Sequence, residues 1–324
     1  MLDRAIGLLR GIRQMWGFDA PCGPEARRLL LAYGAMAASR VRDVDQIGSL
    51  AEVEFSIFSQ WGEDGIIEWL VARNGEMPES FIEFGVEDYR ESNTRFLLCN
   101  RNWRGLVIDG SEANINVVRQ DDISWRYDLT SKAAFIDASN INALIGDAGF
   151  EGDVGMLSID IDGCDYWVWD SISVVNPHIV VAEYNANFGD IIPLTVPYDP
   201  KFRRTAAHWS NLYFGASIGA FEELAIRRGY TLLGTNLAGG NAFFIRNDRL
   251  EHFDGRVRTR DPRPSRFREG RDKKGHLNFV RGLDRAEVIA ALPVTDVKRG
   301  LTRPLGEFGE LFSPRWRAII EGRA

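Results

Sequence analysis

After the first quarter of the chain, short apolar segments alternate with amphipathic ones. The segments at 80–86, 104–111, 154–163 and 177–186 are almost continuously apolar, which predicts strands buried on both faces. A weaker strand is predicted at 123–130. The segments between them carry apolar residues at helical spacing and predict helices. This alternation predicts an α/β fold with a parallel sheet covered by helices on both sides.

The end of this pattern departs from a purely parallel sheet. The apolar segments 230–236 and 241–247 are separated only by the residues LAGG. A connection this short joins antiparallel neighbours, because a parallel crossover needs a dozen or more residues. We therefore predict a doubly wound, Rossmann-like sheet that is mostly parallel and has an antiparallel C-terminal hairpin.

The regions outside the sheet predict two extensions. Residues 1–50 form an N-terminal helical extension of two helices, residues 51–250 the Rossmann-like domain, and residues 251–324 a basic loop followed by a C-terminal helical extension. The Arg-rich loop at 256–274 has no apolar period. It is either a solvated segment or a patch that grips a phosphorylated or otherwise anionic substrate.

Composition and charge exclude several classes of protein. The formal net charge of −7 provides no overall basic field, so we expect no nucleic-acid partner. Three cysteines without a CxxC pair argue against a disulfide framework and suit a cytoplasmic location. No apolar run reaches the roughly 18 residues that a membrane span needs.

The N-terminal residues 1–18 predict an amphipathic helix with arginines largely off its apolar face. Such a helix either packs its apolar face on the domain or lies on an anionic membrane surface as a peripheral contact. The apolar face consists of Leu2, Ile6, Leu9, Ile12 and Trp16.

Polar residues, most of them acidic, follow the predicted strands at their carboxyl ends, where open α/β sheets bind ligands. In chain order they are Glu83, Gly85, Glu87, Asp109, Ser111, Asp128, Asp160, Asp162, Asp165, Glu183, Tyr184 and Asn185. The chain has neither GxGxxG nor GK[ST], and these carboxylates would repel a pyrophosphate. S-adenosylmethionine fits better, because carboxylates can hold its sulfonium, its ammonium and its ribose diol. Asp109, at the end of the second strand, is the expected ligand of the ribose hydroxyls.

Several blocks of the sequence, between residue 55 and about residue 247, match a known family in the same order. FSQWGEDGII, FIEFGVEDYRESNT, WRGLVIDGS, SIDIDGCDYWVWDSI, YFGAS and GGNAFFI resemble the FkbM-type methyltransferases, within the class I S-adenosylmethionine-dependent methyltransferases. The resemblance implies methyl transfer, commonly to a hydroxyl of a sugar or a secondary metabolite. It places near the cofactor Gln60, Glu83, Gly85, Asn93, Asp109, Ser111 and Asp160.

This chain departs from the family in the loop after the first strand. Where the family usually has a second small residue, it has Glu87, Asp88 and Tyr89. We expect this bulkier loop to narrow or reshape the cofactor pocket. Their places at strand ends add Glu87 and Asp128 to the candidate cofactor-binding residues.

The fourth and fifth strand ends also offer hard oxygen ligands. Asp160, Asp162, Glu183 and Asn185 could hold Mg²⁺ or Ca²⁺, or could instead be satisfied by backbone N–H groups and cofactor. Methyl transfer to oxygen without a metal needs a general base. His208, in the segment after the fifth strand, is the best base among four histidines. The candidate catalytic residues are therefore His208, Asp162 and Glu183.

Aromatic and amide side chains suit a sugar-like acceptor, whose CH face stacks and whose hydroxyls need partners. The candidate substrate residues are Tyr184, Asn185, Tyr198, Trp209 and Tyr213. Two other functions remain open at this stage. One is a metal-dependent transferase or hydrolase on the same scaffold, and the other is a non-catalytic glycan-binding or membrane-associated protein. The sequence identifies neither the acceptor nor the oligomeric state.

Overall fold

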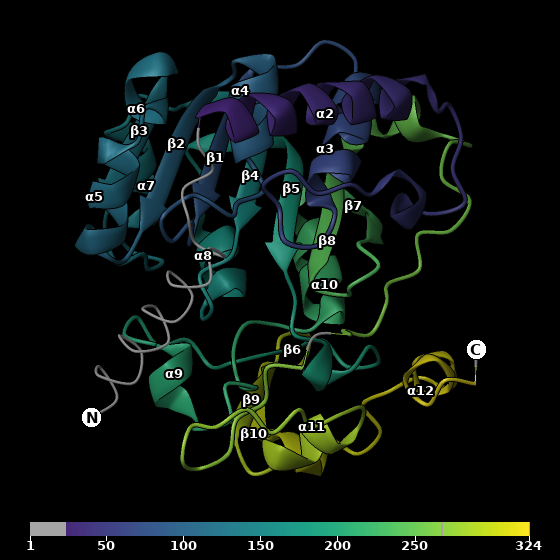
Figure 1. Ribbon diagram of the computed structural model, residues 1–324. Coiled ribbons are helices and arrows are strands. Elements are labelled where there is room, and N and C mark those ends of the chain that lie inside the picture. Colours follow the sequence, from purple (N-terminus) through teal and green to yellow (C-terminus); the bar gives the residue numbers. More distant parts are fainter. Residues whose placement is uncertain (1–23, 267, 324) are drawn as a thin grey trace.

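A seven-stranded sheet forms the centre of the computed structural model, which describes residues 24–266 and 268–323 (Figure 1). Its strand order is β3-β2-β1-β4-β5-β8-β7. The first five strands of this order are parallel, and β8 is antiparallel to both of its neighbours. The strands are β1 (Ser80–Phe84), β2 (Arg104–Asp109), β3 (Leu129–Ala133), β4 (Gly152–Ile159), β5 (Val175–Glu183), β7 (Tyr230–Thr235) and β8 (Asn241–Arg246). The predicted doubly wound sheet with an antiparallel hairpin is confirmed.

The apolar strands are buried because each face of the sheet has its own hydrophobic core. Successive side chains of a strand point to opposite faces, so Phe81 joins one core and Ile82 the other. Helices α3 (Glu63–Arg73), α4 (Arg95–Arg101) and α5 (Glu112–Gln120) supply the first core. Helices α7 (Ile141–Gly146), α8 (Asp165–Ser171) and α10 (Ile218–Arg228) supply the second. Helix α2 (Pro24–Asp43) lies outside α3 and α4 (Figure 1).

The third strand begins later than predicted. Residues 123–126 form the short helix α6 (Ile123–Arg126), and the strand β3 follows it. Asp121 precedes this helix and accepts the backbone N–H of Ile123 at 3.1 Å, while Arg95 donates to the other carboxylate oxygen at 3.1 Å. Asp128 therefore precedes β3 and does not lie at its carboxyl end, so its predicted position was wrong.

The hairpin between β7 and β8 is closed by one side chain. The Asn236 Oδ1 atom accepts the backbone N–H groups of Gly239 and Gly240 at 3.0 Å and that of Asn241 at 3.2 Å. The Asn236 amide nitrogen donates to Glu63 Oε1 at 2.7 Å, which ties the turn to α3. The short connection that predicts an antiparallel pair is thus also fixed by hydrogen bonds.

A second, three-stranded antiparallel sheet lies beyond the carboxyl ends of the main strands (Figure 1). It joins β6 (Leu194–Thr195), from the insert after β5, to β9 (Pro293–Asp296) and β10 (Leu301–Pro304). The C-terminal region thus contains strands besides the predicted helices. The remaining elements are α9 (Arg204–Ala207), α11 (Asp284–Val288), α12 (Pro314–Ile320), η1 (Leu50–Val53), η2 (Ala186–Phe188), η3 (Asn247–Phe253) and η4 (Leu305–Phe308).

Three predictions concern the ends of the chain. The amphipathic helix predicted within residues 1–18 lies outside the described residues. Within residues 24–266 and 268–323, no helix combines the length and the apolar character needed to cross a bilayer. The boundaries near residues 50 and 250 remain predictions, although β9 links the C-terminal region to the insert after β5.

Candidate functional site

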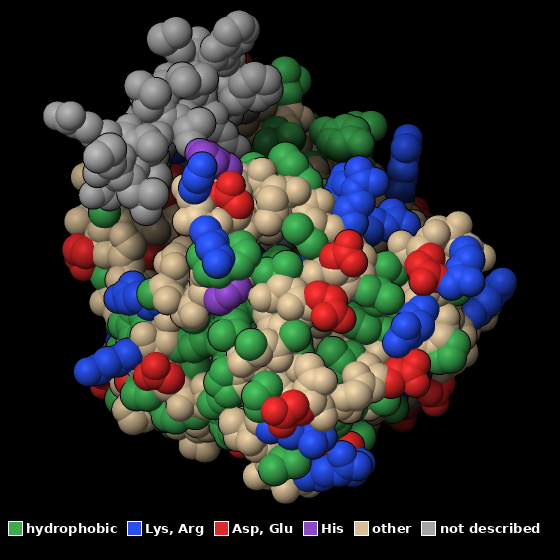
Figure 2. Space-filling model, turned by 90° about the horizontal axis from the view of Figure 1, so that it is seen from below, with side chains coloured by type: hydrophobic (Ala, Val, Ile, Leu, Met, Phe, Trp, Pro, Cys, Tyr) green, Lys and Arg blue, Asp and Glu red, His purple; other side chains and the backbone are tan. Residues whose placement is uncertain are grey.

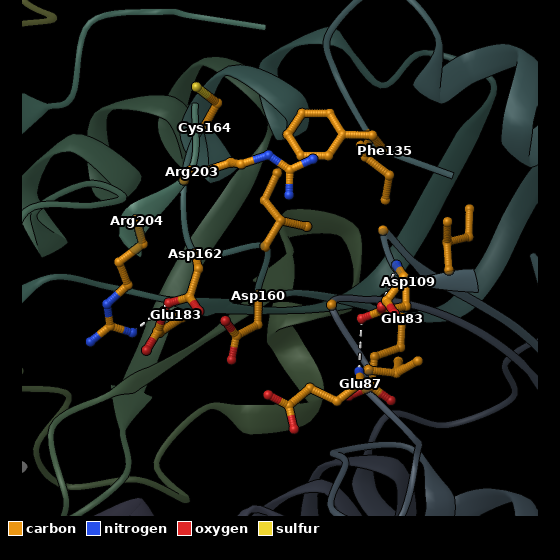
Figure 3. Close-up of a pocket in the computed structure, with 18 of the residues that line it drawn as sticks. Glu83, Glu87, Asp109, Phe135, Asp160, Asp162, Cys164, Glu183, Arg203 and Arg204 are labelled. Carbon is orange, nitrogen blue, oxygen red and sulfur yellow. Dashed lines mark hydrogen bonds and ion pairs between the residues drawn. The ribbon is translucent and has the colours of Figure 1, made fainter. Parts of the chain in front are cut away.

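A cavity of about 890 Å³ opens at the carboxyl ends of β1, β2, β4 and β5 (Figure 3). We call it the main cavity. It lies where the strand order reverses between β1 and β4, the place at which open α/β sheets bind ligands. Its volume falls within the range of about 300–1,000 Å³ that is usual for small-molecule sites.

The lining of the main cavity is strongly acidic. Ten carboxyl side chains line it, against two arginines, Arg203 and Arg204. The ten are Glu83, Glu87, Glu91, Asp109, Asp137, Asp160, Asp162, Glu183, Asp199 and Glu269. This excess of negative charge favours a cationic occupant over a phosphate-bearing one.

The turn after β1 comes very close to the end of β4. Gly85 has a φ of +74°, and a Cβ atom at this position would lie 1.5 Å from the carbonyl oxygen of Asp160. Its backbone N–H donates to the carbonyl of Ile108 in β2 at 2.9 Å. Glycine is therefore required here both by the conformation and by the close backbone approach.

Glu83 organises the next loop through its buried carboxylate. Its Oε1 atom accepts the backbone N–H of Asn93 at 2.9 Å. Its Oε2 atom accepts the Ser92 hydroxyl at 2.7 Å, the Thr94 backbone N–H at 3.1 Å and the Thr94 hydroxyl. Burial raises the pKa of Glu83, and these hydrogen bonds oppose the rise. Asn93 also lines the main cavity, and its side-chain amide donates a hydrogen bond to the Ser158 hydroxyl at 3.1 Å.

The bulky residues of the first loop divide between the core and the main cavity. Tyr89 is fully buried away from the cavity, and its hydroxyl lies 2.9 Å from that of Thr94. Glu87 lines the cavity, and both residues have a positive φ. Partial burial raises the pKa of Glu87, as do the carboxylates of Asp88 and Asp109. Of the three bulky residues in this loop, only Glu87 lines the cavity, which stays open beside it.

Asp109 connects two loops at the end of β2. One carboxylate oxygen accepts the backbone N–H of Glu87 at 2.9 Å. The other accepts the backbone N–H of Ser111 at 2.7 Å and the Asn114 amide at 3.2 Å. Ser111 caps α5 by accepting the Asn114 backbone N–H at 3.3 Å. Because a carboxylate offers about four acceptor positions, Asp109 keeps room for a ligand hydroxyl.

Three carboxylates meet at the ends of β4 and β5. Asp160, Asp162 and Glu183 each place one oxygen within 4.8 Å of the others. Burial raises the pKa values of Asp160 and Glu183 well above the ordinary range, and the neighbouring carboxylates add to the rise. Asp162 instead pairs with Arg204 at 2.5 Å, and Arg204 also contacts Glu269 at 3.3 Å. The cluster can hold a cation or share protons.

A smaller cavity of about 70 Å³ adjoins the main one, and Tyr184 and Asn185 line it. The Asn185 amide donates to the carbonyls of Leu212 and Phe214 at 2.9 Å, and its oxygen accepts the backbone N–H of Asn187 at 2.9 Å. Both ends of this amide are thus bound within the protein, so Asn185 fits poorly as a metal ligand. The Tyr184 hydroxyl donates to the carbonyl of Arg263.

Four predicted site residues do not line either cavity. Asp128 is 71% exposed and pairs with Arg104. His208 Nδ1 lies 2.7 Å from the Ser210 hydroxyl, and its ring packs on Trp209 at 4.7 Å. Burial lowers the pKa of His208, and the charge of Lys273 adds to this effect. The Tyr213 hydroxyl donates to the carbonyl of Pro293. The other candidates, Gln60 and Tyr198 among them, line one cavity or both.

The structure adds lining residues that sequence reasoning missed. Phe135 follows β3, Arg203 and Arg204 lie in the insert after β5, and Glu269 comes from the basic segment. Asn241 lines both cavities and donates its amide to Glu63 Oε1 at 2.8 Å. Phe135 could have been found only with the correct end of β3, and the two arginines stand in the insert that supplied the substrate candidates.

No protein-family model and no curated protein matches the chain. Solved structures similar to it include an O-methyltransferase from Bacillus cereus in complex with SAH, at 12% identity and a TM-score of 0.37, covering 72% of this chain and 96% of that one. An S-adenosylmethionine-dependent methyltransferase from Clostridium acetobutylicum is similar at 10% identity and a TM-score of 0.35, and the match covers 56% of this chain and 89% of that one. An O-methyltransferase family protein from Burkholderia thailandensis is similar at 12% identity and a TM-score of 0.33, and the match covers 57% of this chain and 58% of that one. Likenesses this distant assign no function, and the fold assignment rests on the strand order itself.

Proposed function

We propose that this protein is an S-adenosylmethionine-dependent methyltransferase that acts on a hydroxyl of a polar, sugar-like small molecule or glycan. The observation that carries the proposal is the acidic main cavity at the point where the strand order reverses. An excess of eight carboxyl groups over arginines disfavours nucleoside phosphates and suits a nucleoside whose reactive group is a cation.

The residues present fit this cofactor. Asp109 has an acceptor position left for a ribose hydroxyl, and Glu87 brings a second carboxylate beside it. Gly85 can adopt the φ of +74° found at this turn, and because it has no Cβ atom the backbone of the first loop can lie against the end of β4. When bound, the cofactor supplies an electrophilic methyl group on a positive sulfur. Asp160 and Glu183 stand at the neighbouring strand ends, and a cation bound there would favour their ionised, negatively charged forms.

The carboxylate cluster is a better source of the general base than His208. Glu183 lines the cavity, and a cationic cofactor would favour its ionised form. In that form its raised pKa makes it a stronger base than an ordinary carboxylate. His208 lies outside the cavity and is hydrogen-bonded to Ser210. In the proposed reaction Glu183 takes the proton of the acceptor hydroxyl.

Isothermal titration with S-adenosylmethionine and S-adenosylhomocysteine tests the proposal. We expect saturable heat with a stoichiometry of one for both compounds. ATP should displace neither, because the acids on the proposed cofactor side of the cavity repel its phosphates. Absence of heat with folded protein would refute the proposal. Once an acceptor is found, Glu183→Gln should lower kcat by about 10²–10⁴-fold, as loss of a general base does. His208→Ala serves as its control and should leave kcat nearly unchanged.

A second candidate function is a metal-dependent transferase or hydrolase on the same scaffold. The geometry of Asp160, Asp162 and Glu183 supports it, because their oxygens lie within 4.8 Å of one another and carboxylates are the preferred ligands of Mg²⁺. Thermal unfolding with Mg²⁺, Mn²⁺ and Ca²⁺ checks this candidate. Stabilisation by a metal that disappears in Asp162→Asn supports it, and equal stabilisation of both proteins counts against it.

A further inference from the structure

The two arginines of the main cavity differ in how they are bound. Arg204 pairs with Asp162 and Glu269, and its Nε atom donates to the carbonyl of Asn211 at 2.8 Å. Arg203 is exposed, and within the described part of the chain it makes neither an ion pair nor a hydrogen bond through its side chain. The lining therefore contains one arginine whose charge is neutralised and one whose charge is not.

Arg203 is nevertheless held in a defined position. Its guanidinium carbon lies over the ring of Phe135, 4.7 Å from the ring centroid. The contact joins the insert after β5 to the loop after β3, and the Tyr198 hydroxyl joins the same two segments by accepting the backbone N–H of Ala138 at 3.2 Å. A guanidinium stacked on a ring keeps its N–H edge free for a planar, bidentate partner.

Arg203 lies apart from the acids that follow β1 and β4. Figure 3 shows Arg203 and Phe135 together along one side of the cavity, while Asp160, Glu87 and Glu83 lie across it. An anionic group would be repelled by the acidic floor and attracted only beside Arg203. On the coloured part of the lower face in Figure 2, basic and acidic side chains are interleaved. Among the described residues that line the main cavity, the unpaired positive charge is thus that of Arg203.

We propose that the acceptor carries an oxyanion, a carboxylate or a phosphate monoester, and that Arg203 binds it at the rim of the main cavity. This inference rests on the proposed function and specifies its substrate class. Arg203 would hold the oxyanion while the acceptor hydroxyl points inward to the carboxylate cluster. Because the arginine can bind only one side of the acceptor, it would also fix which hydroxyl faces the cofactor.

The test uses inorganic phosphate and benzoate as probes of the full-length protein, with and without saturating S-adenosylhomocysteine. Binding is followed by ³¹P and ¹H NMR titration. We expect Arg203→Gln to weaken binding of both probes by about tenfold or more, as the loss of a charged hydrogen-bonding partner does. Arg203→Lys, which keeps the charge but not the fork, should restore part of the affinity.

Two control variants separate Arg203 from other basic residues. Lys201 is exposed two residues away and does not line the cavity, so Lys201→Gln removes the same charge from the same segment and should change little. The second control is Lys273→Gln: Lys273 belongs to the basic segment, and its charge contributes to the lowered pKa of His208. Equal losses in Lys201→Gln and Arg203→Gln, or binding that depends on Lys273 instead, would overturn the assignment.

The cofactor titration keeps this inference distinguishable from the proposed function. Arg203→Gln should bind S-adenosylhomocysteine as the wild-type protein does, because the acids of the cofactor side are untouched. If the wild-type protein binds the probes through Arg203 but gives no heat with S-adenosylhomocysteine, the oxyanion site stands and the methyltransferase proposal fails. If the nucleoside binds but neither probe does, the proposed function stands and the oxyanion site fails.

Discussion

Glu83→Gln tests whether the first strand serves the cavity by holding its loop. The wild-type carboxylate accepts four hydrogen bonds, one on Oε1 from Asn93 and three on Oε2 from Ser92 and Thr94. Glutamine has the same size but only one acceptor oxygen. If that oxygen takes the place of Oε2, its NH₂ group faces the backbone N–H of Asn93, and two donors then oppose each other.

The size of the effect follows from this change. Hydrogen bonds to a charged group are worth about 1.5–3 kcal/mol each, and those to a neutral group about 0.5–1.5 kcal/mol. Weakening three bonds and leaving one buried donor without a partner should therefore cost about 3–5 kcal/mol of the free energy of unfolding. Burial raises the pKa of Glu83, so the cost of the substitution should grow as the pH rises and the carboxylate form becomes favoured.

Urea unfolding followed by tryptophan fluorescence gives the free energy, and hydrogen exchange gives its location. Exchange should accelerate in the peptide that contains residues 92–94 more than in the peptide that contains β5. Glu79→Gln is the matched control, because Glu79 is exposed on the same segment and should change stability by less than about 0.5 kcal/mol. A cost below about 1 kcal/mol for Glu83→Gln would contradict a carboxylate with four bonds.

Three further predictions concern the same cavity. Asp109→Asn should weaken S-adenosylhomocysteine binding by about 10–100-fold in isothermal titration, the equivalent of one charged hydrogen bond, whereas Asp128→Asn should leave it unchanged. Gly85→Ala should destabilise the protein by more than the roughly 1–2 kcal/mol of a left-handed alanine, because its Cβ would also meet the Asp160 backbone; a thermal shift no larger than that for Ala at an open glycine would refute this. The raised pKa values of Asp160 and Glu183 mean that the folded protein holds protons that the unfolded chain releases above about pH 4. Stability should therefore fall as the pH rises through those raised values, and urea midpoints that rise over the same range would contradict it.

Local pattern was enough to predict the main sheet. Apolar runs buried on both faces have few alternatives to central strands, and the hairpin followed from a connection too short for a crossover. The acids Glu83, Asp109, Asp160 and Glu183 were located together for the same reason, because carboxyl ends of parallel strands share one edge. The roles given to these residues remain proposals.

What the sequence could not predict depends on contacts between distant segments. The helix α6 occupies the start of the predicted strand and is preceded by Asp121, which binds Arg27 and Arg95 from other helices. The sequence around residue 121 contains no pattern that predicts ion pairs with these two arginines, which are 94 and 26 residues away. Likewise, Arg204 and Glu269 are 65 residues apart, and only the folded chain shows that one neutralises the other and leaves Arg203 with its charge.

Tyr89 shows a different limit. A large side chain in the first loop predicts a narrower pocket only if it points into that pocket. Its positive φ turns the loop so that the ring enters the core of the α3 face and its hydroxyl reaches Thr94. Side-chain direction in a loop has no period that a sequence pattern could reveal.

The pairing of β6 with β9 sets an order for synthesis on the ribosome. The main sheet is complete once residue 246 has emerged, yet the partner of Leu194 is Asp296. At roughly 5–20 residues per second, the hundred or so residues between Leu194 and Asp296 take about 5–20 s to translate. During that time the insert that carries Arg203 has no second sheet to hold it. The nascent chain should thus form the part of the cavity proposed to bind the nucleoside first, and the part proposed to bind the acceptor only after β9 has emerged.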